Sequence, residues 1–371
     1  MDKKRLLSID TLRGMDMLLI MGLSTLILRV CDLFPNGSDC WLASQMHHVA
    51  WNGLAIMDMV FPTFLFIAGL SFPFSYASQL AKGRTSRQIH RKIFVRCLLL
   101  VVLGVVYNGF FRLEFPQRYA SVLGRIGLAW MFAALLYVHC KPKPRAVLAA
   151  VLAAVLLVGY GLLVGLVAAP DAPAGAGPLT QDGCLNGWVD RLLLPGRLHN
   201  GNFDPEGLLG VIPATVTALL GMFTGDFIRL PEEKMSGPKK TRWMLAAAAA
   251  LLAVGYLGSL VLPLNKKLWS STFVLVVGGY SLAVYAVVYY LVEVKDRTGW
   301  TFFFRVIGLN SITIYLLQQI VPLRDVTAFF LGGAAKLLPD AWGALLLALG
   351  YVSVCWLLLY FLYKKKVFLK I

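Results

Sequence analysis

Apolar stretches of membrane length alternate with short polar or basic stretches along the whole chain. A helix needs about 20 apolar residues to cross a bilayer, and backbone inside hydrocarbon must satisfy its own hydrogen bonds, which favours helices. The pattern therefore predicts an all-α, polytopic transmembrane helix bundle that forms a single domain over residues 1–371. The ten predicted spans are residues 14–31, 54–79, 92–111, 121–139, 146–168, 206–228, 243–263, 269–292, 301–320 and 341–363.

One further apolar stretch, 325–338, is short and contains Gly332, Gly333 and Lys336. It predicts a re-entrant or interfacial helix, with an eleventh span as the alternative. The first apolar run ends without a small-residue cleavage site, so we expect it to be retained as the first span. The sequence contains no clear internal repeat and no soluble second domain.

Composition and charge agree with a membrane protein. The chain is 58% hydrophobic and 15% charged, whereas soluble domains are about 45–50% apolar and about 25% charged. Its net charge of +16 does not indicate nucleic acid, because the basic residues lie in short loops between spans. The termini and alternate loops carry 25 of the 35 Lys and Arg residues. By the positive-inside rule, both termini are cytoplasmic, and 169–205 is the longest periplasmic loop.

The six cysteines divide between the two sides of the predicted topology. Cys31, Cys40 and Cys184 fall on the outer side, where an oxidising periplasm would permit a disulfide. Two of the three can pair, but spacing does not say which two. No CxxC and no His/Cys cluster suggests a metal site, so we expect no metal.

The second span begins with polar residues where a lipid-facing helix would carry leucine. His47, His48, Asn52 and Asp58 all lie near its outer end. Polar groups in a membrane are costly and usually serve a function, and histidine suits proton transfer near neutral pH. A helix that begins by Val49 would put His48 and Asn52 on one face, but Asp58 would need another helix to reach His48. A histidine at the lipid headgroups is the alternative.

Polar residues also interrupt several other spans. One internal cavity explains them better than separate local contacts, although Arg125 could snorkel outward and the Asn310–Ser311 pair could join helices. These residues are Asp16, Asn108, Arg125, Asp226, Asn310 and Ser311.

A basic cytoplasmic stretch, 82–96, contains Arg84, Arg87 and Arg91. Such a cluster can bind phosphate groups, and anionic lipid headgroups would satisfy it equally well. Neither a Walker loop nor a GxGxxG motif is present, so no nucleotide-hydrolysing or dinucleotide fold is implied. On the outer side, the mixture of polar residues in 184–206 suits a hydroxyl-rich ligand, with a solvated loop as the alternative.

An ordered series of residues opens the second span: His48, Trp51, Asn52, Gly53, Asp58, Val60, Phe61 and Pro62. This series resembles the signature of the heparan-α-glucosaminide N-acetyltransferase family. Shorter stretches match the family in the same order, namely Asp10–Gly14, Val122–Gly127, Asp204–Gly210 and Gly308–Ser311.

The resemblance implies a homodimeric membrane enzyme that takes acetyl from cytoplasmic acetyl-CoA and passes it to the amine of a terminal glucosamine across the membrane. The family's catalytic histidine corresponds to His48. The chain departs from the family at Ser24, where an asparagine is expected, and this leaves the acceptor sugar open. The chain resembles a bacterial, inner-membrane member, for which the acceptor would be another amino sugar or glycan.

Together, the residues and the resemblance predict a site. His48 acts as general base with Asp58 nearby, and Asn52 stabilises the oxyanion; a covalent acetyl-histidine is the competing mechanism. The predicted acetyl-CoA residues are Arg84, Arg87, Arg91, Arg125, Asn310 and Ser311. The predicted acceptor residues are His47, Trp51, Ser24, Asp204 and Glu206.

Two other functions remain open at this point. An O-acetyltransferase of a surface glycan would use the same histidine and differ only in its acceptor. A transporter of a sugar or organic anion would also need a polar cavity, but transporters more often show an internal repeat. Both enzyme hypotheses predict that the protein binds acetyl-CoA, whereas the transporter hypothesis does not.

Overall fold

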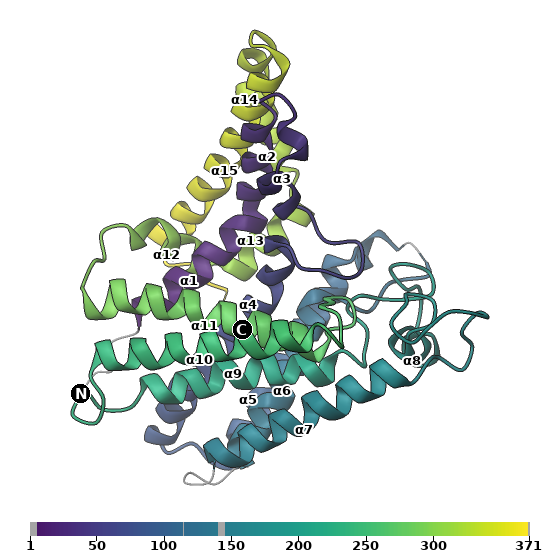
Figure 1. Ribbon diagram of the computed structural model, residues 1–371. Helices are drawn as coiled ribbons and strands as arrows, with labels where there is room; N and C mark the ends of the chain where they lie inside the picture. Colours follow the sequence, from purple (N-terminus) through teal and green to yellow (C-terminus); the bar gives the residue numbers. More distant parts are fainter. Residues whose placement is uncertain (1–5, 114, 140–144, 370–371) are drawn as a thin grey trace. The chain divides into compact units, whose positions relative to one another are not determined.

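The computed structural model describes residues 6–113, 115–139 and 145–369, and 71% of it is helical (Figure 1). This confirms the all-α prediction. Two isolated β-bridges join Arg118 to Gly196 and Ala168 to Cys184. The α-helices are α1 Leu7–Leu18, α2 Ser24–Cys31, α3 Trp41–Gln45, α4 Ile56–Ala81, α5 Ser86–Tyr107, α6 Val122–His139, α7 Arg145–Leu166, α8 Leu185–Leu193, α9 Val211–Ile228, α10 Gly237–Gly258, α11 Ser271–Tyr289, α12 Thr301–Leu309, α13 Ser311–Ile320, α14 Leu323–Lys336 and α15 Asp340–Lys364.

Among the described residues, seven helices are long and apolar enough to cross a membrane, or eight if the bent pair α12 and α13 forms one span. The chain is therefore a multi-pass membrane protein, and each of the ten predicted spans contains a helix. The count of ten is not confirmed, because α5 and α7 do not qualify as spans. The first turns of α5 are rich in Arg and Lys, and the apolar part of α7 that can be assessed is only Ala150–Leu166.

The helix α14 is 14 residues long. At 1.5 Å per residue it extends about 21 Å, whereas the hydrocarbon core is about 30 Å thick. This length agrees with the predicted re-entrant or interfacial helix, which remains a prediction.

The chain divides into two compact units. The first contains the described residues within 1–50, 54–60 and 287–370, and the second contains 51–53 and 61–286. The single domain expected from the sequence remains a prediction.

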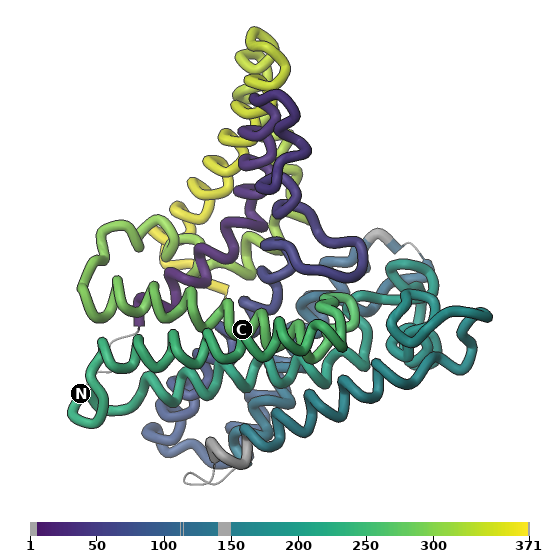
Figure 2. The backbone as a smooth tube through the Cα atoms, in the orientation of Figure 1, coloured from purple at the N-terminus to yellow at the C-terminus, as the bar shows by residue number. Residues whose placement is uncertain are grey.

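In the first unit, helices from the early and late parts of the sequence lie side by side: α1 packs against α12, and α2 packs against α15 (Figure 2). Close contact between α1 and α12 depends on two glycines. A Cβ on Gly14 would lie 1.8 Å from the backbone oxygen of Phe304, and a Cβ on Gly308 would lie 2.1 Å from that of Asp10. The backbones therefore approach to a distance that only glycine permits, as small residues allow between membrane helices.

The N-terminal helix bends between α1 and α2. Residues Leu19–Leu23 form one π-helical turn, η1, in which Gly22 has a φ of 136°. Only glycine adopts this backbone without strain, and Gly22 packs against Tyr351 and Val352 of α15. The predicted first span is thus one bent helix, Leu7–Cys31.

In the second unit, the long helix α4 packs against α9 through another pair of glycines. A Cβ on Gly69 would lie 2.1 Å from the backbone oxygen of Ala218, and one on Gly221 would lie 2.1 Å from that of Phe66. The helix α9 also packs against α6 and α7, and α5 packs against α6 (Figure 1). These contacts support the loops that precede α6 and α9, which carry the ion pair between Arg118 and the buried Asp204.

Candidate active site

The predicted catalytic histidine lies in a loop. The helix α4 begins at Ile56, and residues 46–55 are not helical. The condition under which His48 and Asn52 would share a helical face, a helix that begins by Val49, is therefore not met. The physical reason lies in Asp58, whose carboxylate accepts hydrogen bonds from the backbone N–H groups of Val49 and Ala55, both at 3.2 Å.

The same carboxylate meets the imidazole of His48. His48 Nδ1 and Asp58 Oδ1 are 2.8 Å apart, with Asp58 2% exposed at the side chain and His48 58% exposed. The loop folds back onto the first turn of α4, so no other helix is needed to close the gap between the two residues. This corrects the expectation drawn from their spacing.

This geometry determines which nitrogen can accept a proton. Asp58 is an acceptor on both oxygens, so His48 Nδ1 donates to it and the lone pair lies on Nε2. In Ser–His–Asp enzymes a buried aspartate holds a histidine in the same way, which makes the outer nitrogen a base. The His48–Asp58 pair is thus suited to general acid–base chemistry at an exposed face.

The residues before His48 are held by a separate contact. Gln45, the last residue of α3, accepts a hydrogen bond from the backbone N–H of Ile56 at 3.2 Å. His47 is exposed, and its proposed contact with the acceptor remains a prediction. Ser24 donates its hydroxyl to the Leu19 backbone oxygen at 3.0 Å, which gives it a local role in the bend of the first helix.

In the second unit, Trp51, Asn52 and Gly53 are fixed to the loop before α11. The backbone N–H of Gly53 donates to Leu264 at 2.8 Å, and the buried Asn265 donates its side-chain amide to Asn52 Oδ1 at 3.1 Å. Since the Asn52 oxygen is occupied, its own amide N–H groups are the donors it can offer a ligand. The sequence did not reveal Asn265, because a lone asparagine in a loop carries no distinguishing pattern.

Trp51 forms part of a small apolar cluster. Its indole N–H donates to the Leu179 backbone oxygen at 2.7 Å, and its ring lies edge-on to Phe203 at 5.4 Å between centroids. Lys267 Nζ lies 5.7 Å from the Trp51 ring. Trp51 is half-buried, and its predicted contact with a sugar remains a prediction.

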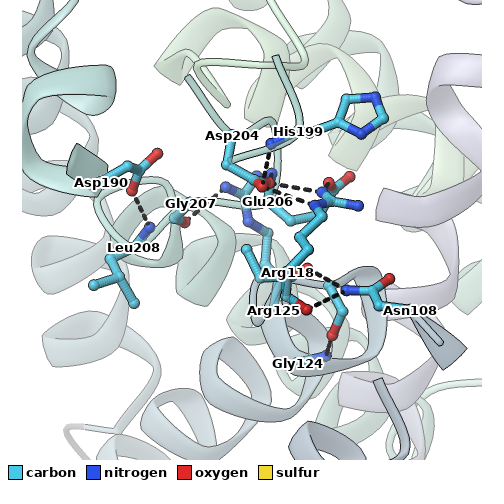
Figure 3. A network of polar contacts seen from close by, with 12 residues as sticks. Asn108, Arg118, Gly124, Arg125, Asp190, His199, Asp204, Glu206, Gly207 and Leu208 are labelled. Carbon is cyan, nitrogen blue, oxygen red and sulfur yellow. Dashed lines mark hydrogen bonds and ion pairs between the residues drawn. The ribbon is translucent and has the colours of Figure 1, made fainter. Parts of the chain in front are cut away.

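A network of charged residues orders the loops before α6 and α9 in the second unit (Figure 3). Arg118 donates to both oxygens of Asp204, at 2.8 and 2.7 Å, and also pairs with Glu206. Asp204 accepts two further bonds from the backbone N–H groups of His199 and Glu206. Burial is the largest single influence and raises the pKa of Asp204, but the hydrogen bonds and charge of Arg118, together with the two backbone hydrogen bonds, hold it below its ordinary value.

These bonds bear on the predicted acceptor residues. Both oxygens of Asp204 are engaged within the network, and its residue surface is only 1% exposed. The geometry gives Asp204 and Glu206 a role in ordering the loop, while direct contact with an acceptor remains a prediction. Arg118 was missed from the sequence, because an arginine in a polar loop ordinarily faces water.

Arg125 of α6 lies in the same network and is 2% exposed. Its Nη2 donates to the Gly207 backbone oxygen at 2.8 Å, and its guanidinium lies 5.3 Å from the centre of the Trp269 ring. Its Nε and Nη1 atoms have no hydrogen-bond partner. Arg125 therefore does not snorkel outward, and it retains donors that a ligand could use.

Asp190 of α8 is the second buried charge that the sequence did not reveal. Its Oδ1 accepts from the Leu208 N–H at 2.8 Å, whereas Oδ2 has no partner (Figure 3). Burial raises the pKa of Asp190 to about 6. A Cβ on Gly207 would lie 1.8 Å from Asp190 Oδ2, and one on Gly210 would lie 2.8 Å from Arg125 Nη2, so the Asp204–Gly210 motif closes around these two charges.

Asn108 and Asp226, which were expected to line a cavity, have local partners instead. Asn108 donates its amide to the backbone oxygens of Arg118 and Ala120, at 3.1 and 2.7 Å. Asp226 accepts from the Tyr137 hydroxyl at 2.6 Å and pairs with Arg229 at 3.4 Å. Both contacts join neighbouring elements of the second unit.

Asn310 and Ser311 lie at the 65° break between α12 and α13. Both are buried, and the Asn310 Nδ2 atom has no hydrogen-bond partner. The Asn310 side-chain oxygen accepts from Thr313 at 3.4 Å. The break supplies a polar group inside an apolar helix pair, and its contact with acetyl-CoA remains a prediction.

The basic stretch gathers several cations at the start of α5. Lys92 lies close enough to Arg84, Arg96 and Lys82 for mutual repulsion. The helix begins with a capping box between Thr85 and Gln88. Like charges so placed are stabilised by an anion, so the cluster suits phosphate groups or anionic lipid headgroups. Arg87 and Arg91 are exposed on the same helix.

The fold and the site define a multi-pass membrane protein with a buried aspartate that orients an exposed histidine at the start of a membrane helix. The family model described as heparan-alpha-glucosaminide N-acetyltransferase, catalytic, matches residues 5–258. The chain therefore belongs to this family, as the sequence motifs predicted.

Two curated relatives carry the family's name, heparan-alpha-glucosaminide N-acetyltransferase. The protein of Homo sapiens is 28% identical over 368 residues, which cover 85% of this chain and 53% of that protein. The protein of Mus musculus is 27% identical over 429 residues, which cover 99% of this chain and 60% of that protein. The chain thus spans between half and two thirds of the length of these relatives.

Proposed function

We propose that the protein is a transmembrane acetyltransferase that moves acetyl from cytoplasmic acetyl-CoA to the amine of a glucosamine-type sugar on the outer side. The observation that carries this proposal is the 2.8 Å contact between His48 Nδ1 and the buried Asp58. Family membership supports the reaction class, because both relatives are named as N-acetyltransferases.

His48 acts as the general base in the proposed reaction. Its Nε2 takes a proton from the amine as the amine nitrogen attacks the thioester carbon, and Asn52 donates to the oxyanion that forms. The carbon–sulfur bond then breaks, and the CoA sulfur takes the proton back from His48. Asp58 stabilises the imidazolium formed between these two steps. In the competing route, His48 Nε2 attacks the thioester carbon first, and the carbon–sulfur bond breaks to release the CoA thiolate. The amine then attacks the acetyl-histidine, His48 leaves, and the amine proton passes to the thiolate.

The acetyl-CoA phosphates are proposed to bind the cluster of Lys82, Arg84, Lys92 and Arg96, with Arg87 and Arg91 alongside. Three observations support binding of a phosphate-bearing thioester by this chain: the mutual repulsion around Lys92, and the unpartnered donor atoms of Arg125 and Asn310. The orientation with both termini in the cytoplasm, the bacterial inner membrane and the homodimer belong to the same proposal.

The test is acetyl transfer by the purified full-length protein in detergent. Labelled acetyl-CoA is offered with glucosamine and with a panel of sugars that carry only amines or only hydroxyls. Transfer to amino sugars that disappears in His48→Ala supports the proposal, provided that the variant keeps its melting temperature and size-exclusion profile. Transfer to hydroxyls alone would favour a glycan O-acetyltransferase. Without transfer or acetyl-CoA binding, the proposal fails and a transporter is favoured.

A further inference from the structure

Two thiols lie next to each other just before the segment that carries His48. Cys31 is the last residue of α2, and Cys40 immediately precedes α3. Their sulfur atoms are 3.7 Å apart. Cys184, the third cysteine on the predicted outer side, belongs to the second unit and donates to the Gln181 backbone oxygen at 3.3 Å.

The loop between the two cysteines is built to hold them together. The backbone N–H of Phe34 donates to Cys31, that of Gly37 donates to Phe34, and that of Cys40 donates to Gly37, at 3.0 to 3.3 Å. Gly37 lies so close to Cys31 that a Cβ would be 1.7 Å from the Cys31 oxygen. Asn36 has a φ of 56°, in the left-handed region that asparagine tolerates. The loop conformation therefore fixes the approach of the sulfurs.

The two sulfurs differ in environment. Cys40 is half-buried and accepts a hydrogen bond from the Ala43 N–H at 3.4 Å. This bond lowers the pKa of the Cys40 thiol, and a thiolate is the reactive form in disulfide exchange. Cys31 is buried. Cys40 is thus the sulfur that an oxidant meets first, and Cys31 is placed to complete the bond.

We propose that Cys31 and Cys40 form an intrachain disulfide by exchange with a protein or small-molecule disulfide. The Cys40 thiolate attacks one sulfur of that oxidant, which forms a mixed disulfide and releases one thiolate. The Cys31 thiol then loses its proton and attacks Cys40, and the second thiolate leaves. Two protein thiols become one disulfide, and the oxidant is reduced to two thiols. The sulfurs must close from 3.7 Å to about 2.05 Å.

The bond would restrain the segment that presents His48. The helix α3 follows Cys40 directly, and Gln45 at its end accepts the hydrogen bond from Ile56 at the start of α4. A disulfide closing the loop from Cys31 to Cys40 therefore removes freedom from the segment before His48. It stabilises mainly by restricting the unfolded chain, so we expect reduction to lower the melting temperature by about 2–5 °C.

The experiment uses the full-length protein, purified under reducing conditions and then exposed to oxidised glutathione. Remaining thiols are alkylated, and each cysteine is assigned by peptide mass spectrometry. We expect Cys31 and Cys40 to lose alkylation together and to appear as one linked peptide pair. Cys184 should alkylate to the same extent before and after oxidation once the protein is denatured. Full alkylation of Cys31 and Cys40 after oxidation, or a link from either to Cys184, would overturn the proposal.

Variants extend the test to stability. Cys31→Ser with Cys40→Ser should lower the melting temperature to that of the reduced wild type and should remove its sensitivity to oxidised glutathione, while Cys184→Ser should leave that sensitivity unchanged. An oxidised wild type that melts at the same temperature as the reduced protein would refute the proposed restraint. Since mapping uses the wild type, the pairing is testable even if a variant fails to fold. Neither cysteine alkylation nor the melting temperature depends on acetyl transfer. Failure of the disulfide proposal can therefore be distinguished from failure of the proposed function.

Discussion

Replacement of Asp58 by asparagine tests whether this residue sets the proton on His48. The carboxylate accepts hydrogen bonds from His48 Nδ1 and from the backbone N–H groups of Val49 and Ala55. An asparagine has one acceptor oxygen and one donor nitrogen. When the asparagine oxygen accepts from the two backbone N–H groups, the asparagine NH₂ group points at His48. The histidine must then accept on Nδ1, which places its proton on Nε2 and prevents Nε2 from acting as a base.

The magnitude follows from the step that is lost. General base catalysis contributes about 10²–10⁴-fold in rate, which corresponds to about 3–5 kcal/mol of transition-state stabilisation at 1.36 kcal/mol per tenfold. Asp58→Asn should therefore lower kcat for acetyl transfer about 10²–10⁴-fold. The KM for acetyl-CoA should change little, because Asp58 is only 2% exposed and offers almost no surface to a ligand.

The assay is steady-state transfer from labelled acetyl-CoA, with thermal unfolding and acetyl-CoA binding measured on the same samples. Asp325→Asn removes the same charge from an exposed position and serves as the control. The double variant with His48→Ala should be no slower than His48→Ala alone, since both residues serve one step. A variant Asp58→Asn that keeps more than about a third of the wild-type kcat would refute the reasoning.

Three further predictions concern binding, pH and packing. The double variant Arg84→Gln with Lys92→Gln should raise the Kd of acetyl-CoA about tenfold in isothermal titration, because it removes two cations of the cluster. Since the pKa of Asp190 is about 6 in the folded state against 3.8 ordinarily, folding stability falls as pH rises between these values. Above pH 6, Asp190→Asn should therefore be more stable than wild type and should melt at a higher temperature. The gain in the free energy of unfolding is at most about 3 kcal/mol, and it should vanish toward pH 4. Gly308→Ala should destabilise the protein by about 1–3 kcal/mol, because its Cβ would meet the Asp10 oxygen at 2.1 Å.

Matched variants separate these effects from general damage. Lys239→Gln with Arg242→Gln removes two exposed cations elsewhere and should leave the Kd unchanged; equal weakening by both pairs would contradict a specific phosphate site. A stability difference for Asp190→Asn that is constant with pH would contradict the assignment of its pKa. Gly333→Ala adds a Cβ where no atom lies within 4 Å and should be tolerated, so an equal loss in both glycine variants would argue against the close α1–α12 contact.

The helices could be predicted from the sequence because hydropathy determines them locally. Each predicted span contains a helix, and the break at Asn310 falls within the predicted ninth span. The number of helices that are long and apolar enough to cross a membrane was predicted less well than the helices themselves. One reason is that α5 begins with arginines and lysines, which lower its hydropathy. The predicted second span begins at residue 54, close to the observed start of α4 at Ile56. The shape of the loop before it could not be predicted, because it depends on hydrogen bonds from backbone N–H groups to the Asp58 carboxylate.

For the site, too, the sequence indicated some of the residues but not the contacts between them. His48 and Asp58 could be identified as unusual polar residues, but their contact could not, since it depends on a loop that hydrophobic spacing does not encode. Arg118 and Asp190 were missed because loop charges ordinarily face water, and their burial arises only when distant segments pack. Asp190 is 18 residues from Leu208, whose N–H it accepts, and Arg118 is 86 residues from Asp204.

The motifs that carry the resemblance to the family therefore have different structural roles. Gly14 and Gly308 belong to two short motifs that interlock at the backbone level in the first unit. Gly207 and Gly210 belong to a third motif, Asp204–Gly210, whose backbone packs tightly against the side chains of Asp190 and Arg125 in the second unit. Substitutions there change packing first and activity only through it. The motif from His48 to Asp58 is different, because it contains an exposed histidine held by a buried carboxylate, which is the pair proposed to act as the base. Loss of kcat at normal stability is thus diagnostic for that motif, whereas loss of stability is the expected result for the glycines.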